Sequence, residues 1–210
     1  MKLIEQSSRG FSEQLASHSP TPGGGSAAAI IGSYGAALSA MVAQFTIGRE
    51  KYAEHEETMK DTLAQVENLR KEFLAAVDAD AEAYSAFGDA LKLPKSTPEE
   101  KASRTESMQN ALKKAALIPL HVMELSQKAL QLTNNAVGIS NPNVISDLGV
   151  AALSLRTALC GAWLNVLINL SSIKDEAFID EYRKRGESLI SEALSIADEI
   201  YEKVLNNVGG

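Results

Sequence analysis

The sequence predicts an all-α protein, an antiparallel bundle of about six helices, of which several are long and one is kinked. No β-branched run with alternating polarity and flanking turn residues indicates a strand. Long segments with helical apolar spacing are instead separated by proline, glycine and asparagine. The 210 residues, 45% hydrophobic and 22% charged, are typical of a chain with a substantial core, so we expect residues 1–210 to form a single domain.

Helix-breaking residues divide the first half of the chain into three predicted helices. The first, over residues 3–16, ends at residues 17–25, which contain two prolines and three glycines. The second begins at Ser26 and runs to residue 48. The third covers residues 54–91 and ends before a proline, since the residue preceding proline disfavours helical backbone angles.

Capping signals mark the three predicted helices of the second half. The fourth helix, over residues 97–135, opens on a Thr-Pro-Glu-Glu capping box, and Pro119 is expected to kink it. The fifth follows an Asn-Pro pair and covers residues 141–170. Asp175 is expected to cap the sixth. Its core-facing stripe consists of Phe178, Tyr182, Leu189, Ala193, Ile196, Ile200 and Val204.

Two of these segments are long and apolar enough to cross a membrane, but their composition favours interior helices. Residues 24–48 are dominated by alanine, glycine and serine, which enter lipid only weakly. Residues 148–170 include one arginine and two asparagines, which are costly in a bilayer. Small residues recur at every fourth position of the first segment, a pattern that favours a bundle centre or a dimer seam: Gly32, Ala36 and Ala40.

Charge and composition count against several classes of partner. The 20 Lys and Arg against 27 Asp and Glu give a net charge of −7, and only 5% of residues are aromatic, so nucleic acid and anionic membrane are disfavoured. Cys160, the sole cysteine, cannot form an intrachain disulfide, and three scattered histidines lack metal-ligand spacing, so we expect no metal site. No apolar run typical of a signal peptide follows Met1, so we expect a cytoplasmic protein.

The third predicted helix carries the strongest candidate for chemistry. Alternating steps of four and three select a seam that is apolar except for two residues: Met59, Leu63, Val66, Arg70, Phe73, Val77, Asp80, Tyr84, Phe87 and Leu91. Asp78 lies off this seam and can reach water. A carboxyl group facing the core is poorly solvated, which raises its pKa, so Asp80 is a candidate general acid and base. The alternative is an interhelical ion pair.

The glycine-rich segment before the second helix is a candidate binding loop. Gly23, Gly24, Gly25 and Ser26 lead into a helix N-terminus, where free backbone N–H groups attract an anion or a polar ring edge. A tight turn with Ser26 as the helix cap explains the same residues.

The fifth predicted helix has one stripe of small or polar residues: Asp147, Ala151, Ser154, Ala158, Gly161, Asn165 and Asn169. Such a stripe either packs tightly on another helix or lines a cavity for a polar heterocycle. Asp147 has a further alternative, since a carboxylate near a helix start stabilises the helix dipole.

Five segments, taken in order, resemble the all-helical cyclodeaminase domain of the formiminotransferase-cyclodeaminase family. They are residues 20–29 (PTPGGGSAAA), 77–84 (VDADAEAY), 93–101 (LPKSTPEEK), 146–147 (SD) and 165–170 (NVLINL). The resemblance spans about residues 17–180. It implies a homodimer of antiparallel helices that binds a tetrahydrofolate derivative in a cleft, in a stand-alone form without the formiminotransferase half.

The same resemblance implies roles for individual residues. The catalytic aspartate of the family falls on Asp80. Substrate-binding roles fall on Gly23, Gly24, Gly25, Ser26, Asp147, Asn165 and Asn169. Relatives commonly carry Gly-Asn where this chain has Ser140-Asn141, which leaves the role of Asn141 open. No metal and no cofactor beyond the folate substrate is expected.

Three functions remain open at this point. The first hypothesis is conversion of 5-formiminotetrahydrofolate to 5,10-methenyltetrahydrofolate with release of ammonia, in which Asp80 relays the proton. The second is hydrolysis of 5,10-methenyltetrahydrofolate to 10-formyltetrahydrofolate. The third is a non-catalytic helical ligand-binding or scaffold dimer. Basic residues expected to meet the glutamate tail of a folate are Arg49, Lys51 and Lys95.

Overall fold

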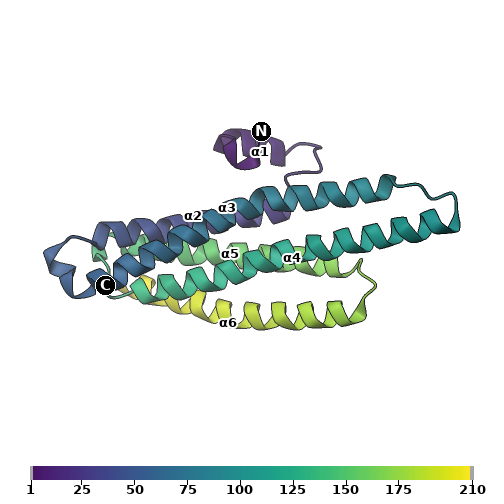
Figure 1. Cartoon of the computed structure of the whole chain (residues 1–210). Helices are drawn as coiled ribbons and strands as arrows, with labels where there is room; N and C mark the ends of the chain where they lie inside the picture. Colours follow the sequence, from purple (N-terminus) through teal and green to yellow (C-terminus); the bar gives the residue numbers. More distant parts are fainter. Residues whose placement is uncertain (1, 209–210) are drawn as a thin grey trace.

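The structure is a computed structural model that describes residues 2–208 and is all-α, as predicted. The six α-helices are α1 (Ser8–Leu15), α2 (Gly24–Thr46), α3 (Glu56–Lys92), α4 (Pro98–Ala136), α5 (Ile145–Leu170) and α6 (Glu176–Val208). Short 3-10 turns η1 (Leu3–Glu5), η2 (Glu50–His55) and η3 (Pro142–Val144) connect them, and no strand occurs in this range. Figure 1 shows α2 to α6 as a bundle of long helices lying side by side, with α1 apart from it beside α3.

Local capping signals fix the ends of the long helices close to the predicted positions. The Thr97 hydroxyl accepts a hydrogen bond from the Glu100 backbone N–H (3.2 Å), and Glu100 Oε2 accepts one from the Thr97 N–H (3.1 Å). Asp175 Oδ1 accepts a hydrogen bond from the Phe178 N–H (3.1 Å). The predicted capping box and cap are therefore confirmed. Pro119 is buried inside α4, which continues to Ala136, and the kink there stays a prediction.

Two predicted helices begin later than expected. The segment 3–16 is divided into η1 and α1, because Ser7 is extended and its hydroxyl accepts the Gly10 N–H (3.1 Å) as the cap of α1. The fifth helix begins at Ile145, after η3. Asn141 explains this turn, since its Oδ1 accepts the Asn143 N–H (3.1 Å).

Asn141 also ties this turn to the end of α2. Its backbone N–H donates to the Thr46 hydroxyl (3.0 Å), and its Nδ2 donates to the Phe45 carbonyl (3.2 Å). The side chain is buried, and both its amide nitrogen and its amide oxygen are hydrogen-bonded. The structure therefore assigns Asn141 a role in joining α2 to η3. It follows Ser140, the position at which this chain departs from the Gly-Asn pair of its relatives.

The centre of the bundle is α2, which packs between α3 and α5. A Cβ atom on Gly32 would lie 2.4 Å from Cε1 of the buried Phe73, and one on Gly35 would lie 2.7 Å from Leu155 Cγ. Ala36 and Ala40 are buried as well. The small residues of α2 therefore let two neighbouring helices approach it closely. Of the two predicted alternatives, a bundle centre or a dimer seam, this packing corresponds to the bundle centre.

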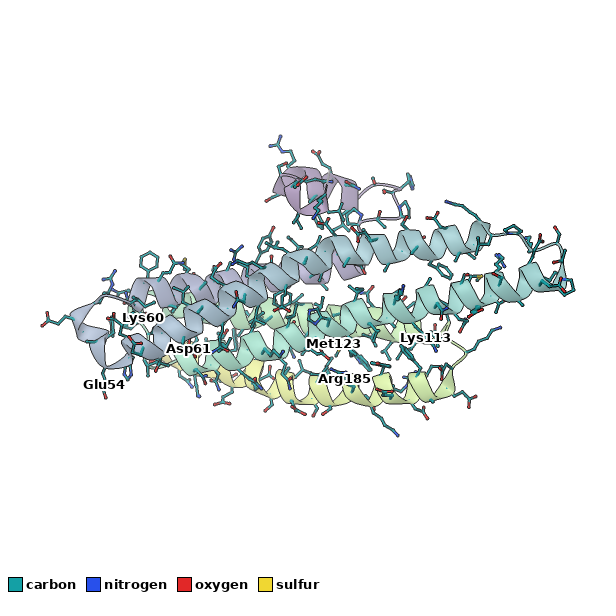
Figure 2. All side chains as sticks on the ribbon, in the orientation of Figure 1. Glu54, Lys60, Asp61, Lys113, Met123 and Arg185 are labelled. Atoms are coloured by element: carbon teal, nitrogen blue, oxygen red, sulfur yellow. The ribbon has the colours of Figure 1, made fainter. Side chains whose placement is uncertain are left out.

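The outside of the bundle is covered with charged side chains (Figure 2). Lys60 Nζ pairs with Glu56 (2.9 Å) and Glu57 (3.0 Å) on α3, and Arg185 of α6 pairs with Glu124 of α4. Exposed pairs of this kind stabilise a fold only slightly. Burial of the apolar faces of the helices therefore dominates the stability.

Both apolar segments form helices that are long and apolar enough to cross a membrane, yet they pack as neighbours in the bundle. Of the most apolar window of α2, 61% is buried, against 39% for the segment Pro142–Leu170. The prediction of an interior helix is confirmed for α2. It is only partly right for α5, because one face of α5 exposes large apolar side chains: Val150, Leu153, Leu164 and Ile168.

The seam predicted on α3 is buried in its first part and leaves the core further along. Met59, Phe73 and Val77 are fully buried, whereas Tyr84 is 54% exposed. The α3–α4 turn projects beyond α5 and α6 (Figure 1), so the last seam positions have fewer facing helices. The prediction that Arg70 faces the core is wrong. Its long side chain turns to the surface and pairs with Glu67 (2.7 Å) three residues earlier.

Two helical glycines predict opposite effects of an added methyl group. Gly32→Ala is expected to lower the free energy of unfolding by about 1–3 kcal/mol, because the new methyl group overlaps the Phe73 ring. Gly88→Ala is expected to raise it by up to about 1 kcal/mol, because a Cβ there meets nothing within 4 Å and alanine favours helix. Urea unfolding followed by circular dichroism measures both. Equal effects of the two substitutions would contradict the close packing at Gly32.

Candidate functional site

Asp80 opens onto a cleft of about 380 Å³ where four helices and the segment before α2 meet. The volume lies within the range typical of small-molecule sites. The cleft is lined by Pro20, Thr21, Gly23, Gly24 and Gly25 before and at the start of α2, by Asp80, Tyr84 and Phe87 of α3, by Leu112 and Ala115 of α4, by Asn165, Ile168 and Asn169 of α5, and by Ser172. Most of the predicted site residues therefore lie together.

Ser26 holds the Asp80 carboxyl group. The Ser26 backbone N–H and hydroxyl both donate to Asp80 Oδ2, each at 2.8 Å. The Ser26 side chain is fully buried and is not part of the cleft lining. The predicted substrate contact for Ser26 is therefore not what the geometry shows, because the side chain faces α3 and not the cleft.

Gly25 and Gly24 make room for the polar groups of the cleft. A Cβ atom on Gly25 would lie 2.1 Å from Asp80 Oδ1, so no larger residue fits there without moving the carboxyl group. A Cβ atom on Gly24 would lie 3.3 Å from Asn165 Nδ2, which is a tight contact. The glycines thus allow α3 and α5 to bring their polar side chains against the first turn of α2.

The environment of Asp80 shifts the acid–base equilibrium of its carboxyl group toward the neutral form. Burial raises the pKa of the Asp80 carboxyl above its usual range, and the two hydrogen bonds from Ser26 lower that pKa by less. None of the ion pairs between residues 2 and 208 includes Asp80. The alternative of an interhelical ion pair is therefore not realised within the described part of the chain, and the group can both take and give a proton.

Asn165 and Asn169 line the cleft with their amide orientations fixed. Asn165 Nδ2 donates to the Gly161 carbonyl (2.9 Å), and Asn169 Nδ2 donates to the Ala115 carbonyl (3.0 Å). Within residues 2–208 neither Oδ1 accepts a hydrogen bond. Each amide thus retains an acceptor for N–H groups of a polar ring, and at these two positions the stripe lines a cavity, one of its two predicted alternatives.

Tyr84 and Phe87 form an aromatic wall that the sequence reasoning assigned to the core. Tyr84 is 54% exposed and Phe87 is partly buried, and both line the cleft. They follow Asp80 by four and seven positions, so all three lie on one face of α3. That spacing is the sequence signal for a flat apolar surface next to the carboxyl group, on which a planar ring can stack.

Other predicted residues lie outside the cleft. Asp147 stands in the first turn of α5, about 33 Å from Asn169 along the helix axis at about 1.5 Å per residue. Arg49 and Lys51 lie at the start of η2, at the opposite end of the bundle from the α3–α4 turn (Figure 1), whereas Lys95 lies in that turn. The structure therefore does not bring Asp147, Arg49 or Lys51 to the Asp80 cleft of the same chain.

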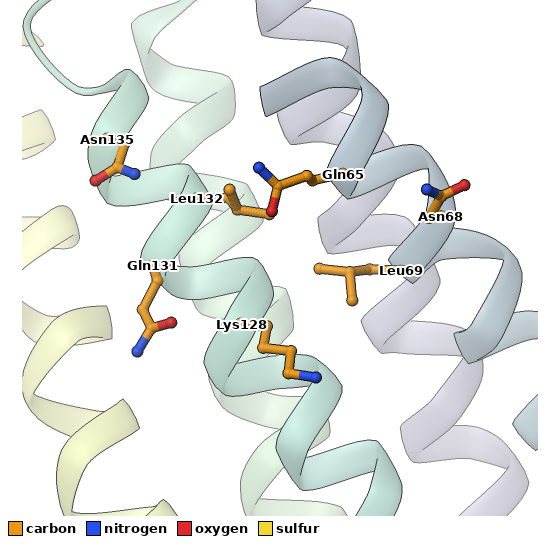
Figure 3. A pocket seen from close by; sticks show the side chains of 7 residues that line it. All are labelled: Gln65, Asn68, Leu69, Lys128, Gln131, Leu132 and Asn135. Atoms are coloured by element: carbon orange, nitrogen blue, oxygen red, sulfur yellow. The ribbon is translucent and has the colours of Figure 1, made fainter. Parts of the chain in front are cut away.

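A second hollow, of about 550 Å³, lies between α3 and α4 and contains none of the predicted site residues (Figure 3). It is lined by Gln65, Asn68, Leu69, Lys128, Gln131, Leu132 and Asn135. Four of its seven lining side chains are amides, one is the amine of Lys128, and none is a carboxyl group. Of these two cavities, only the Asp80 cleft contains a carboxyl group.

Comparisons with known proteins identify the family of this chain. A family model described as formiminotransferase-cyclodeaminase matches residues 7–188. The methenyltetrahydrofolate cyclohydrolase of Methylorubrum extorquens is 43% identical over 94% of this chain and 95% of its own length. The formimidoyltransferase-cyclodeaminase of Rattus norvegicus is 38% identical over 91% of this chain, which spans only 35% of that protein.

A solved structure has the same fold as this chain. The formiminotetrahydrofolate cyclodeaminase of Thermotoga maritima aligns with 100% of this chain and 98% of its own, with a TM-score of 0.82 and 29% sequence identity. Together with the family match over most of the chain, this shows that the protein belongs to the formiminotransferase-cyclodeaminase family of folate one-carbon cyclodeaminases and cyclohydrolases.

Proposed function

We propose that this chain acts on the one-carbon unit between N5 and N10 of a tetrahydrofolate, with Asp80 as general acid and base. The observation that carries the proposal is the position of the Asp80 carboxyl, whose pKa is raised by burial, in a cleft lined by an aromatic wall and two oriented amides. The pterin ring stacks beside Tyr84 and Phe87, and its N–H groups donate to Asn165 and Asn169.

The first candidate reaction is cyclodeamination of 5-formiminotetrahydrofolate. The formimino group reacts in its protonated form, N5–CH=NH2⁺. N10 attacks its carbon and forms the N10–C bond, the C=N double bond becomes a single bond to an amino group, and Asp80 takes the N10 proton. Asp80 then gives that proton to the amino group, the C–N bond breaks and ammonia leaves, and the positive charge stays on the bridge of 5,10-methenyltetrahydrofolate. Asp80 starts and ends as a carboxylate. Proton transfer and an intramolecular ring closure account for the reaction, so no metal or redox cofactor takes part in the proposed steps.

The second candidate is hydrolysis of 5,10-methenyltetrahydrofolate to 10-formyltetrahydrofolate. It is favoured by the 43% identity to a relative that carries the name methenyltetrahydrofolate cyclohydrolase and matches this chain over nearly its whole length. Here Asp80 takes one proton from the attacking water and gives it to N5 as the C–N5 bond breaks, and the remaining hydroxyl proton passes to solvent as the formyl C=O bond forms. The same cleft and the same carboxyl group serve both reactions.

The absorbance of the methenyl group distinguishes the two reactions. Purified protein offered 5-formiminotetrahydrofolate is expected to raise that absorbance and release ammonia, as cyclodeamination requires. A fall in absorbance with 5,10-methenyltetrahydrofolate, without activity on the formimino compound, would assign hydrolysis instead. No change with either compound would leave the non-catalytic binding or scaffold dimer as the function.

Asp80→Asn is expected to lower kcat by about 100-fold or more while the protein stays folded. Asparagine keeps the size of the side chain but cannot relay a proton, and general acid–base catalysis contributes about 10²–10⁴-fold. Circular dichroism checks the fold, and the absorbance assay checks the rate. Full activity of the folded variant would refute Asp80 as the acid and base.

Gly25→Ala is expected to lower kcat by about 100-fold, because its methyl group would stand 2.1 Å from Asp80 Oδ1 and displace the carboxyl group. The matched control is Gly88→Ala, in which the methyl group meets nothing within 4 Å, on a helix residue outside the cleft. Its rate is expected to match that of the wild type. Equal rates for the two variants in the absorbance assay would contradict the close approach of α2 to Asp80.

The outward faces of α2 and α5 support a homodimer as the working assembly. Both helices run antiparallel in contact, with Gly24 near Asn165 and Gly161 near Ala28. Their exposed sides carry large apolar residues: Tyr34 and Phe45 on α2, and Val150, Leu153, Leu164 and Ile168 on α5. No charged residue occurs between residues 24 and 48. An uncharged apolar face of this extent matches a second copy of itself.

Leu164→Glu is expected to convert a dimer into a monomer of 22.4 kDa, because it places a charge within this face, where Leu164 is 67% exposed. Leu205→Glu is the control, since Leu205 is also exposed but lies on α6. Sedimentation velocity measures the mass of both variants. A monomeric wild type, or a dimeric Leu164→Glu variant, would refute this interface.

A further inference from the structure

We infer that Ser26 gives the two Asp80 oxygens different roles: its hydrogen bonds hold Oδ2 in place, so that Oδ1 is the oxygen that takes and gives the proton. Ser26 is thus a positioning residue and not a substrate contact. The inference rests on the proposed role of Asp80 as acid and base and specifies how that role is set up.

The hydrogen bonds of Asp80 are all on one oxygen. The Ser26 N–H and the Ser26 hydroxyl both reach Oδ2 at 2.8 Å, whereas no donor within residues 2–208 reaches Oδ1. Oδ1 lies against Gly25, which lines the cleft. A Cβ atom on Gly25 would lie only 2.1 Å from Oδ1. One oxygen is therefore anchored in the interhelical contact, and the other is left beside the ligand space.

Two donors on Oδ2 direct protonation to Oδ1. An oxygen that already accepts two hydrogen bonds is a poor site for a further proton, because its lone pairs are in use. With a proton on Oδ1, Oδ2 is a carbonyl oxygen and keeps the bond from the Ser26 backbone N–H. The carboxyl group thus changes its protonation state without rotating, and the proton is held on the cleft side throughout.

Ser26 keeps a hydrogen-bond acceptor in either state of Asp80. Its hydroxyl oxygen also lies 3.1 Å from the Val77 carbonyl oxygen, one turn before Asp80 on α3. The single hydroxyl proton can turn to Val77 when neutral Asp80 attracts it less. The buried hydroxyl is therefore never left without a partner, and its side chain stays in place.

The groups that face Asp80 from the packed elements are otherwise neutral. Tyr84 of α3 is the only other titratable side chain in the cleft lining. The start of α2 contributes glycines, α4 contributes Leu112 and Ala115, and α5 contributes two amides and Ile168. A change in the titration of Asp80 on substitution of Ser26 therefore reports the two bonds to Oδ2.

Ser26→Ala is expected to move the acidic limb of the kcat/KM profile upward by about one pH unit. Loss of the hydroxyl donor leaves the carboxylate less stable, which raises the Asp80 pKa further, by the amount of one hydrogen bond to a charged acceptor. We expect kcat to fall about tenfold and KM to stay within about twofold, because Ser26 does not line the cleft. Ser26→Cys, which keeps the volume but donates weakly, is expected to shift the limb in the same direction.

Ser126→Ala is the matched control. The Ser126 hydroxyl is equally buried and donates to the Val122 carbonyl (2.8 Å) inside α4, away from Asp80. Its pH profile is expected to match that of the wild type. If the Ser26 variants match it too, or raise KM with kcat unchanged, the positioning role is refuted. If Asp80→Asn retains the wild-type rate, the proposed function itself fails, so the two failures are distinguishable.

Discussion

The site depends on one steric condition, the small size or absence of side chains on the face of α2 that meets α3. Gly32 accommodates the buried Phe73 ring, and two turns earlier Gly25 accommodates the Asp80 carboxyl group. The close approach of α2 and α3 thus packs the core at Gly32 and positions the carboxyl group of the cleft at Gly25. Because α2 contacts α5 as well, the small residues of α2 allow α3 and α5 to border the same cleft.

The acid–base character of Asp80 results from two opposing effects of this packing. Burial between helices destabilises the carboxylate, whereas the first turn of α2 supplies two donors that stabilise it. Burial has the larger effect, so the pKa is raised while the group remains anchored. An ion pair at this place would have reversed the balance and fixed the group in its charged form.

The sequence predicted those features that depend on neighbouring residues along the chain. Thr97 and Asp175 cap their helices through bonds to residues three positions away, and the seam spacing placed Asp80 on the inner face of α3. Features set by the relative lengths of helices were missed. Arg70 and Tyr84 occupy seam positions, but whether a facing helix covers them depends on tertiary structure. For Asp147, the stripe on α5 correctly gave the face but not the distance along the helix.

The two parts of α3 have different roles, one in the core and one at the cleft. Its first part, around Met59 and Phe73, is buried in the core, whereas its last part, around Tyr84 and Phe87, borders the cleft and is partly open to solvent. Substitution of the outer aromatic residues would therefore change the wall of the cleft while leaving the buried turns intact. The part of α3 that shapes the cleft can thus vary independently of the part that stabilises the fold.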